Sequence, residues 1–336
     1  MLPPTALTLS ALIALAAQLG GDSDFVLGPL IMNRGEDRQE VYFPRNEELT
    51  YDVAIDLGVL GEPSVGGVVI TSKVRPFERP GATLGDAQDE PVLEQAIVAA
   101  RARGEYQVYS LDETITTRVQ PLAWPHLFHD SVQKGTENRR RELSIGSRDG
   151  ETRSSYRSDG HCKGCEDDAH FVDPTFFWND RSHCDGCKSG AHRVWREPRE
   201  KGAPDDVVDM VTAVMLARTV VQQGKSGAKF TLLDREKLWD VEISRGRRER
   251  REVAAGTFDA VEVVLVTRPP KGEKGREGDF QGLFGLHGNI SIWMHPESGV
   301  PVEIAGTLPA GPLEFDVRVQ LDGYSGTPAS FRKVVK

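Results

Sequence analysis

Short stretches in which apolar and polar residues alternate make up most of the chain between residues 43 and 325. In 43–74, apolar residues alternate from Leu49 to Ile55, a turn rich in Gly and Pro follows, and a second apolar run ends the segment, which predicts a β-hairpin. Further strands are predicted within 105–121, 139–160, 227–233, 237–244, 258–268, 288–295, 300–307 and 312–321. Because few helical patterns interrupt them, the sequence predicts a mainly β fold, an antiparallel curved sheet or a barrel-like (half-barrel) domain.

Two stretches show helical rather than strand periodicity. In 90–104 the apolar residues fall on one helical face and a glycine follows, which predicts a helix. The stretch 205–221 repeats apolar residues at helical spacing over a longer distance. We expect Asp205 to cap its N-terminus and Arg218 to lie near its C-terminal end, where a positive charge is favourable.

The composition is that of a globular protein with one β-rich domain. The chain has 336 residues, of which 38% are apolar, and this is enough for a substantial core. A formal net charge of −10 argues against a general nucleic-acid-binding surface, because such a surface repels phosphate. One basic run, RGRRERR at 245–251, lies between predicted strands, and we interpret it as a hairpin with solvated arginines.

The N-terminal sequence resembles an export signal. An apolar stretch from Ala6 to Ala17 ends in small residues, and Ala14-Leu15-Ala16 fits a cleavage site, so 1–17 is predicted to be a signal peptide. We expect 18–42 to be a loose N-terminal segment. No later stretch is apolar for long enough to cross a membrane, and the mature protein is expected to be periplasmic or envelope-associated.

Four patches carry a family resemblance. FPRNEELTYDV near the start, DVVDMVTAVMLART, VAAGTFDAVEVVL at 253–265 and GNISIWMHPESGVPVEIAG at 288–306 look like those of the bacterial envelope proteins of domain-of-unknown-function family 3108 (DUF3108). The resemblance implies an exported protein with a mostly antiparallel, barrel-like or half-barrel fold over 43–325, and it implies no catalytic residue. We expect Gly256 to precede a strand, Trp293 to lie on an alternating strand, and Pro301 to open a strand, where no backbone donor is needed.

A repeat within 158–198 departs from that family pattern. HCKGCEDDAH at 161–170 and HCDGCKSGAH at 183–192 align without a gap and hold every cysteine of the chain. Two C-x2-C pairs at this separation match a four-thiolate zinc site, so the segment is predicted to be a zinc-ribbon-like insertion with one structural zinc ion. The predicted ligands are Cys162, Cys165, Cys184 and Cys187.

Other arrangements of the repeat stay open. His161, His170, His183 and His192 recur at the same offsets and could serve as alternate ligands, with two metal ions in place of one. Two disulfides are the main rival, because an exported protein meets an oxidising compartment. Haem attachment is excluded, because neither second cysteine is followed by histidine.

Two functions from different classes fit these observations. The first is a non-enzymatic envelope protein whose β domain binds a partner or an apolar ligand, with the zinc site bracing the insertion, because four closed ligands leave no position for water. The alternative is a metal-dependent envelope hydrolase acting on glycan or lipid. His126, His129 and Asp130 form a set suited to acid–base or metal chemistry, but no nucleophile motif accompanies it, and we interpret the set as part of a turn.

Overall fold

The structure is a computed structural model, and it describes residues 25–32, 38–76, 94–106, 109–120, 126–136, 139–161, 193–195, 197–270, 280, 282, 285–310 and 313–334. The strands before the helix are β1 (Phe25–Met32), β2 (Arg38–Pro44), β3 (Asn46–Asp56), β4 (Ser64–Pro76), β5 (Glu94–Tyr106), β6 (Tyr109–Val119), β7 (Leu127–Gly135), β8 (Arg139–Arg148), β9 (Glu151–His161), β10 (Arg193–Trp195), β11 (Arg199–Gly202) and β12 (Val207–Val208). The helix α2 (Met210–Gln222) precedes β13 (Gly227–Asp234), β14 (Lys237–Val253), β15 (Gly256–Arg268), β16 (His287–Met294), β17 (Pro301–Ala310) and β18 (Leu313–Ser325), and a 3-10 turn, η1, covers Gly58–Leu60.

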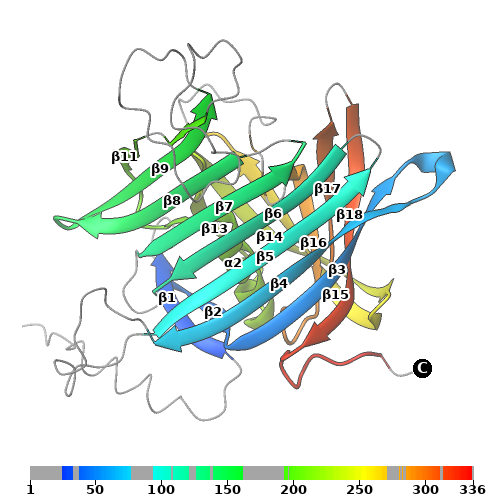
Figure 1. The fold of residues 1–336 in the computed structure, drawn as a ribbon. Helices are drawn as coiled ribbons and strands as arrows, with labels where there is room; N and C mark the ends of the chain where they lie inside the picture. Colours follow the sequence, from blue (N-terminus) through cyan, green and yellow to red (C-terminus); the bar gives the residue numbers. More distant parts are fainter. Residues whose placement is uncertain are drawn as a thin grey trace, which may run out of the picture.

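One 16-stranded sheet forms the body of the molecule. Its strands follow the order β10-β9-β8-β7-β6-β5-β4-β3-β18-β17-β16-β15-β14-β13-β12, with β11 paired to β9. Neighbouring strands are antiparallel except β12 and β13, which are parallel. The sheet curves strongly without closing on itself, as Figure 1 shows, and the predicted mainly β, half-barrel fold is confirmed.

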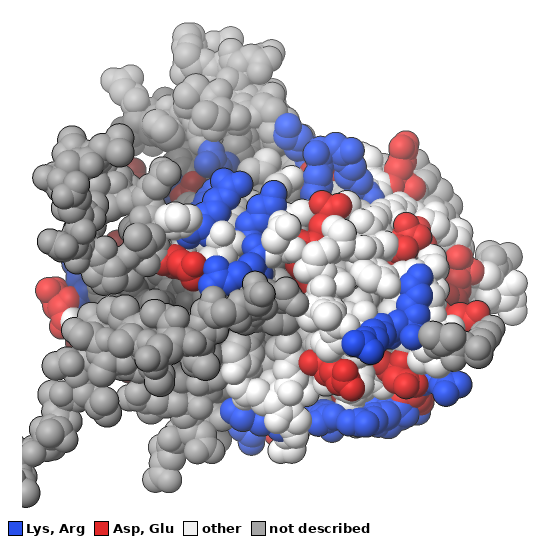
Figure 2. All heavy atoms as spheres, turned by 90° about the horizontal axis from the view of Figure 1, so that it is seen from below, with Lys and Arg blue, Asp and Glu red and all other residues white. Residues whose placement is uncertain are grey.

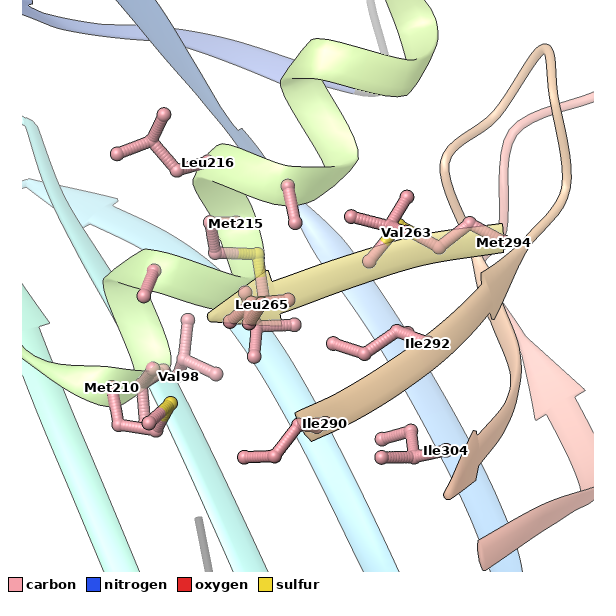
Figure 3. Packing of buried hydrophobic residues seen from close by; sticks show 14 of the residues in the cluster. Val98, Met210, Met215, Leu216, Val263, Leu265, Ile290, Ile292, Met294 and Ile304 are labelled. Atoms are coloured by element: carbon pink, nitrogen blue, oxygen red, sulfur yellow. The ribbon is translucent and has the colours of Figure 1, made fainter. Parts of the chain in front are cut away.

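The helix α2 lies on the concave side of this sheet. From Met210 to Val221 every residue of α2 is buried, as expected for a helix that is apolar around its whole circumference. Figure 3 shows Met210, Met215 and Leu216 of α2 among apolar side chains of the strands, and all belong to one hydrophobic cluster. The concave face is therefore the face that packs on α2, and burying it supplies most of the folding free energy.

The predicted helix at 205–221 is confirmed, with two corrections at its polar residues. The N-cap is Asp209, whose side chain accepts a hydrogen bond from the Thr212 N–H, and not Asp205. Arg218 does not act at an exposed C-terminal end, because it is buried and pairs with Glu47 of β3.

The predicted helix at 90–104 is wrong, because residues 94–106 form β5 between β4 and β6. The run AIVAARARG also alternates with a period of two, and Ala96, Val98, Ala100 and Ala102 all face the core. Alanine favours a helix in isolation, but strands β4 and β6 pair with this segment on both sides from Ala96 to Gly104, and tertiary pairing overrides local propensity.

Part of the N-terminal segment expected to be loose is also structured. β1 and β2 form a separate two-stranded antiparallel sheet. Val41 and Phe43 of β2 are fully buried, and the Tyr42 N–H donates to the Thr219 hydroxyl of α2 at 3.0 Å. The prediction of a loose 18–42 is thus wrong for these two strands, which help to cover α2.

The start and end of the Cys/His segment lie side by side. β9 runs on to His161, so the predicted insertion boundary at 158 falls inside a strand, and β10 begins at Arg193. Arg193 pairs with His161, and Trp195 pairs with Asp159. The chain therefore leaves and re-enters the sheet at neighbouring points, as an insertion requires.

Candidate functional site

Three polar side chains meet where the N-terminus of α2 touches the sheet. The Thr117 hydroxyl of β6 donates to Oδ2 of Asp209 at 2.6 Å, and Nδ1 of His129 on β7 lies 2.8 Å from the same oxygen. Thr117 and His129 are direct neighbours across β6 and β7, so the sheet itself brings them together. Asp209 is 2% exposed and His129 16% exposed in their side chains.

Hydrogen bonds keep the Asp209 carboxyl charged in this buried place. Burial alone raises the pKa of Asp209, but the hydrogen bonds from His129, Thr117 and the Thr212 N–H more than offset it, and the pKa lies below its usual value. An Asp–His pair is one part of a hydrolytic triad, but here the hydroxyl binds the carboxylate and not the outer nitrogen of the imidazole. The geometry is that of an anchor that fixes α2 to the sheet.

The three residues predicted at 126–130 do not form one site. His129 lies on β7 and faces α2, so its assignment to a turn is wrong. Asp130 points to the opposite face of the strand, where Arg140 lies 3.5 Å away, and His126 is exposed before the strand begins. Alternation along a strand separates His129 from Asp130, although they are adjacent in sequence.

The concave face has a second region, beyond the reach of α2. Leu111, Leu308 and Phe315, called here the apolar rim, are half-exposed apolar residues that pack against the core. Leu111 lies about 20 Å along β6 from Thr117. Leu308 and Phe315 are opposite each other on β17 and β18, at the ends far from the β16–β17 turn that touches α2. At this end of the half-barrel, part of the apolar concave face remains accessible.

Two arginines and a tyrosine lie in another part of the concave side, nearer to the N-terminus of α2. Arg141 on β8 has the same strand parity as the buried Leu143 and Ile145, so it points to the concave side. Tyr156 is the neighbour of Leu143 on β9 and is half-buried against the core. Arg235 lies in the turn between β13 and β14, and its electrostatic neighbours include both Arg141 and Tyr156.

The basic run at 245–251 is not the hairpin that the sequence predicted. β14 continues through it to Val253, with an irregularity between Arg245 and Arg248. Arg251 lies over the ring of Trp293 at 3.6 Å from its centroid, and Trp293 is only 2% exposed. Figure 2 shows basic side chains beside acidic ones on one face of the molecule. Within the run, Arg250 forms an ion pair with Asp259. The run is therefore a locally neutralised strand that covers Trp293.

The turn between β16 and β17 explains another of the sequence patches. Gly299 has a φ of 64°, and a Cβ there would lie 2.8 Å from the Arg218 carbonyl oxygen, so only glycine allows this close approach to α2. His295 opens the turn, lies 3.1 Å from the Ser298 hydroxyl and packs edge-on against Phe331. Burial lowers the pKa of His295. Pro301 opens β17 and Gly256 opens β15, as predicted, and these residues have structural roles.

The four predicted zinc ligands, Cys162, Cys165, Cys184 and Cys187, lie outside the described residues, as do His170, His183 and His192. The backbone of His161 ends β9, and its side chain is not described. Within the described ranges, no group of three or more His, Cys, Asp or Glu side chains has the arrangement of a metal site. The zinc site remains a prediction.

The sequence reasoning missed Thr117, Asp209, Arg141, Tyr156 and Arg235. One signal was available for Arg141, because it occupies the same alternating positions as the apolar residues of its strand. The other four come from separate segments, and only the folded structure brings Thr117 to Asp209 and Tyr156 near Arg235.

The chain has a distant structural neighbour among solved proteins. No family model matches the chain, so the resemblance to DUF3108 is not confirmed, and no curated protein matches it. A solved structure from Brucella abortus, described as a β-barrel-like protein of domain of unknown function DUF1849, is similar with a TM-score of 0.49 and 10% sequence identity. The match covers 89% of this chain and 98% of that one. Among the described residues, no helix is long and apolar enough to span a membrane.

Proposed function

We propose that this protein is an exported, non-enzymatic binding protein of the cell envelope, which holds an apolar ligand on the concave face of its half-barrel. The apolar rim carries the proposal. Leu111, Leu308 and Phe315 come from three strands, β6, β17 and β18, and all three are only partly buried on the concave side. Partly buried apolar residues on a concave surface are typical of a ligand site.

The buried polar contacts support a binding role over a catalytic one. Thr117, His129 and Asp209 are used together to cap and anchor α2. The alternative of a metal-dependent hydrolase would need converging ligands, and His129 and Asp130 point to opposite faces of β7. Nothing in the described geometry favours that alternative.

The proposal includes a zinc-braced insertion. The pairing of His161 with Arg193 supports an excursion of the chain that can be ordered separately from the sheet. Four thiolates would provide the folding free energy for such a segment, because its own apolar residues are few.

The apolar-ligand proposal is tested by titrating the purified full chain with N-phenyl-1-naphthylamine, an uncharged dye whose fluorescence increases in apolar sites. We expect saturable binding by the wild type. Phe315→Glu places a charge in the apolar rim and should weaken binding at least tenfold. Val69→Glu is the matched control, because Val69 is an exposed apolar residue on the outer face of β4.

Two outcomes of the dye titration would contradict the apolar-ligand proposal. If the wild type does not bind the dye, or if Phe315→Glu and Val69→Glu bind it alike, the concave face is not a ligand site.

Export is tested separately by mass spectrometry of the protein from its native host, which should show a chain that begins at or near Ala17. Folded cytosolic protein that retains Met1 would show that the chain is not exported.

A further inference from the structure

Arg235 is a half-buried cation with unsatisfied donors. Its Nε and Nη2 atoms are buried and have no hydrogen-bond partner among the described residues. A guanidinium has five N–H donors, and leaving buried ones unpaired is unfavourable. Arg235 also has a φ of 56°, a conformation that glycine or asparagine would adopt with less strain. The position is therefore not explained by turn formation alone.

A second arginine, Arg141, lies near enough for its charge to act on Arg235. Arg141 is half-buried on β8 and makes no ion pair among the described residues, and its charge acts directly on Arg235. Burial, then the positive charge of Arg141 and, to a smaller extent, that of Arg139 lower the pKa of Arg235, while Asp234 and Tyr156 act in the opposite direction. Two positive charges that lie close together in a partly buried position repel each other, and a bound anion would remove that repulsion.

These residues belong to opposite ends of the strand order. Arg141 and Tyr156 lie on β8 and β9 at one end of the sheet, and Arg235 follows β13 at the other. No ladder joins β9 to β13 in the described structure. The ends are held together by contacts near the turn, namely Arg199 with Glu236 at 2.7 Å and the Lys201 ammonium with the Glu236 carbonyl. An anion between Arg141 and Arg235 would thus bridge the two ends.

We infer that Arg141, Tyr156 and Arg235 form a binding site for the anionic head group of an amphiphile, a carboxylate or a phosphate carried on an alkyl chain. Arginine suits such groups, because its planar fork binds two oxygens at once, and the Tyr156 hydroxyl is a further donor. The inference rests on the proposed function, since the alkyl chain would lie on the apolar concave face. It names the chemical class of ligand that this face selects.

The test compares four probes on the purified full chain by isothermal titration calorimetry: dodecanoate, dodecyl phosphate, dodecanol and inorganic phosphate. We expect both charged amphiphiles to bind the wild type at least tenfold more tightly than dodecanol. Whichever of dodecanoate and dodecyl phosphate binds more tightly identifies the head group. Because the ligand bridges the sheet ends, it should also raise the thermal unfolding temperature.

Arg235→Gln and Arg141→Gln should each remove this preference and leave dodecanol binding unchanged. Arg248→Gln is the matched control, because it removes the same charge from an exposed arginine of β14. Both site variants should be at least as stable as the wild type without ligand, because each removes a repelling charge. A clear loss of stability would show that these arginines have structural partners, and would overturn the inference.

Two further results separate this inference from the function on which it rests. If dodecanol binds as tightly as dodecanoate and dodecyl phosphate, or if all three arginine variants keep the preference for charge, the apolar site stands and the head-group site is refuted. If none of the three alkyl probes binds, the apolar-ligand function fails. In that case, binding of inorganic phosphate that depends on Arg235 would still support the anion site. If inorganic phosphate does not bind either, both the apolar-ligand function and the anion site are overturned.

Discussion

Arg218 of α2 and Glu47 of β3 form a buried bidentate ion pair. Nη1 and Nη2 of the guanidinium lie 2.6 and 3.0 Å from the two carboxylate oxygens, and the side chains are 2% and 3% exposed. Tyr51 lies nearby on β3 and donates its hydroxyl proton to the Pro301 carbonyl at 3.0 Å. Burial, and then the charge of Glu47, raise the pKa of Tyr51 far above its usual value, so it stays a neutral donor. This pair fixes the second half of α2 to the sheet.

Removing one partner of this pair should be more damaging than removing both. Arg218→Met leaves a buried carboxylate and should lower the free energy of unfolding by about 3–5 kcal/mol. The double variant Glu47→Leu/Arg218→Met buries no charge and should be more stable than either single variant. Urea unfolding of the four proteins measures this. Additive losses in the double variant would mean that the two residues act independently.

Asp209 should make the free energy of unfolding decrease at acidic pH. Its pKa is lowered in the folded protein, so its stabilising contribution is present above the unfolded-state pKa of about 3.9 and is lost as the pH falls below that value. Asp209→Asn should therefore be less stable than the wild type at pH 6, and the difference should shrink towards pH 3. Unfolding measured at both pH values tests this. Asp316→Asn, at an exposed position, is the control and should show no such convergence.

Arg251 should contribute more to the burial of Trp293 than Arg247, which lies over the same ring at the longer distance of 5.5 Å. Its guanidinium lies over the indole and also 3.5 Å from Glu303. Arg251→Ala should lower the unfolding free energy by about 1–2 kcal/mol and shift tryptophan emission to the red. The exposed Arg248→Ala should change neither quantity. Equal effects of the two substitutions would contradict a specific cover for Trp293.

The Cys/His insertion should be dispensable for the fold of the sheet. Because Arg193 pairs with His161, replacing 162–192 by a short glycine-rich turn should preserve the β circular-dichroism signal and cooperative unfolding. Loss of all structure would show that the insertion is part of the main core.

The metal prediction is checked on the intact chain by elemental analysis of protein purified without added metal. We expect about one zinc ion per chain, held by Cys162, Cys165, Cys184 and Cys187. Changing Cys162 and Cys184 to Ser should remove the metal and make the chain sensitive to protease at the insertion. Less than about 0.2 zinc per chain, together with no free thiols after unfolding, would favour two disulfides.

The sequence by itself determined the class of the fold and most of its strands. Alternation with a period of two is imposed by a sheet with one buried face, so local pattern could predict β3, β4, β6, β8, β9, β13, the first part of β14 and the strands from β15 to β18. The helix α2 could be predicted from apolar residues repeated at helical spacing. The sequence of β5 fits both a helical period and a period of two, so the pattern alone could not decide between helix and strand. The hydrogen bonds from the neighbouring strands β4 and β6 determine that it is a strand.

The tertiary structure alone decided what the polar residues do. Asp209 and not Asp205 caps α2, because β12 extends to Val208 before the helix begins. Arg218 pairs with Glu47, and Arg235 lies near Arg141, although the members of each pair are far apart in the sequence. No local sequence pattern could predict these pairs. Such pairs depend on strand order and register, since a shift of one residue would turn every side chain to the opposite face. The amino-acid pattern thus specifies a curved sheet around a helix, and the register of that sheet creates the candidate site.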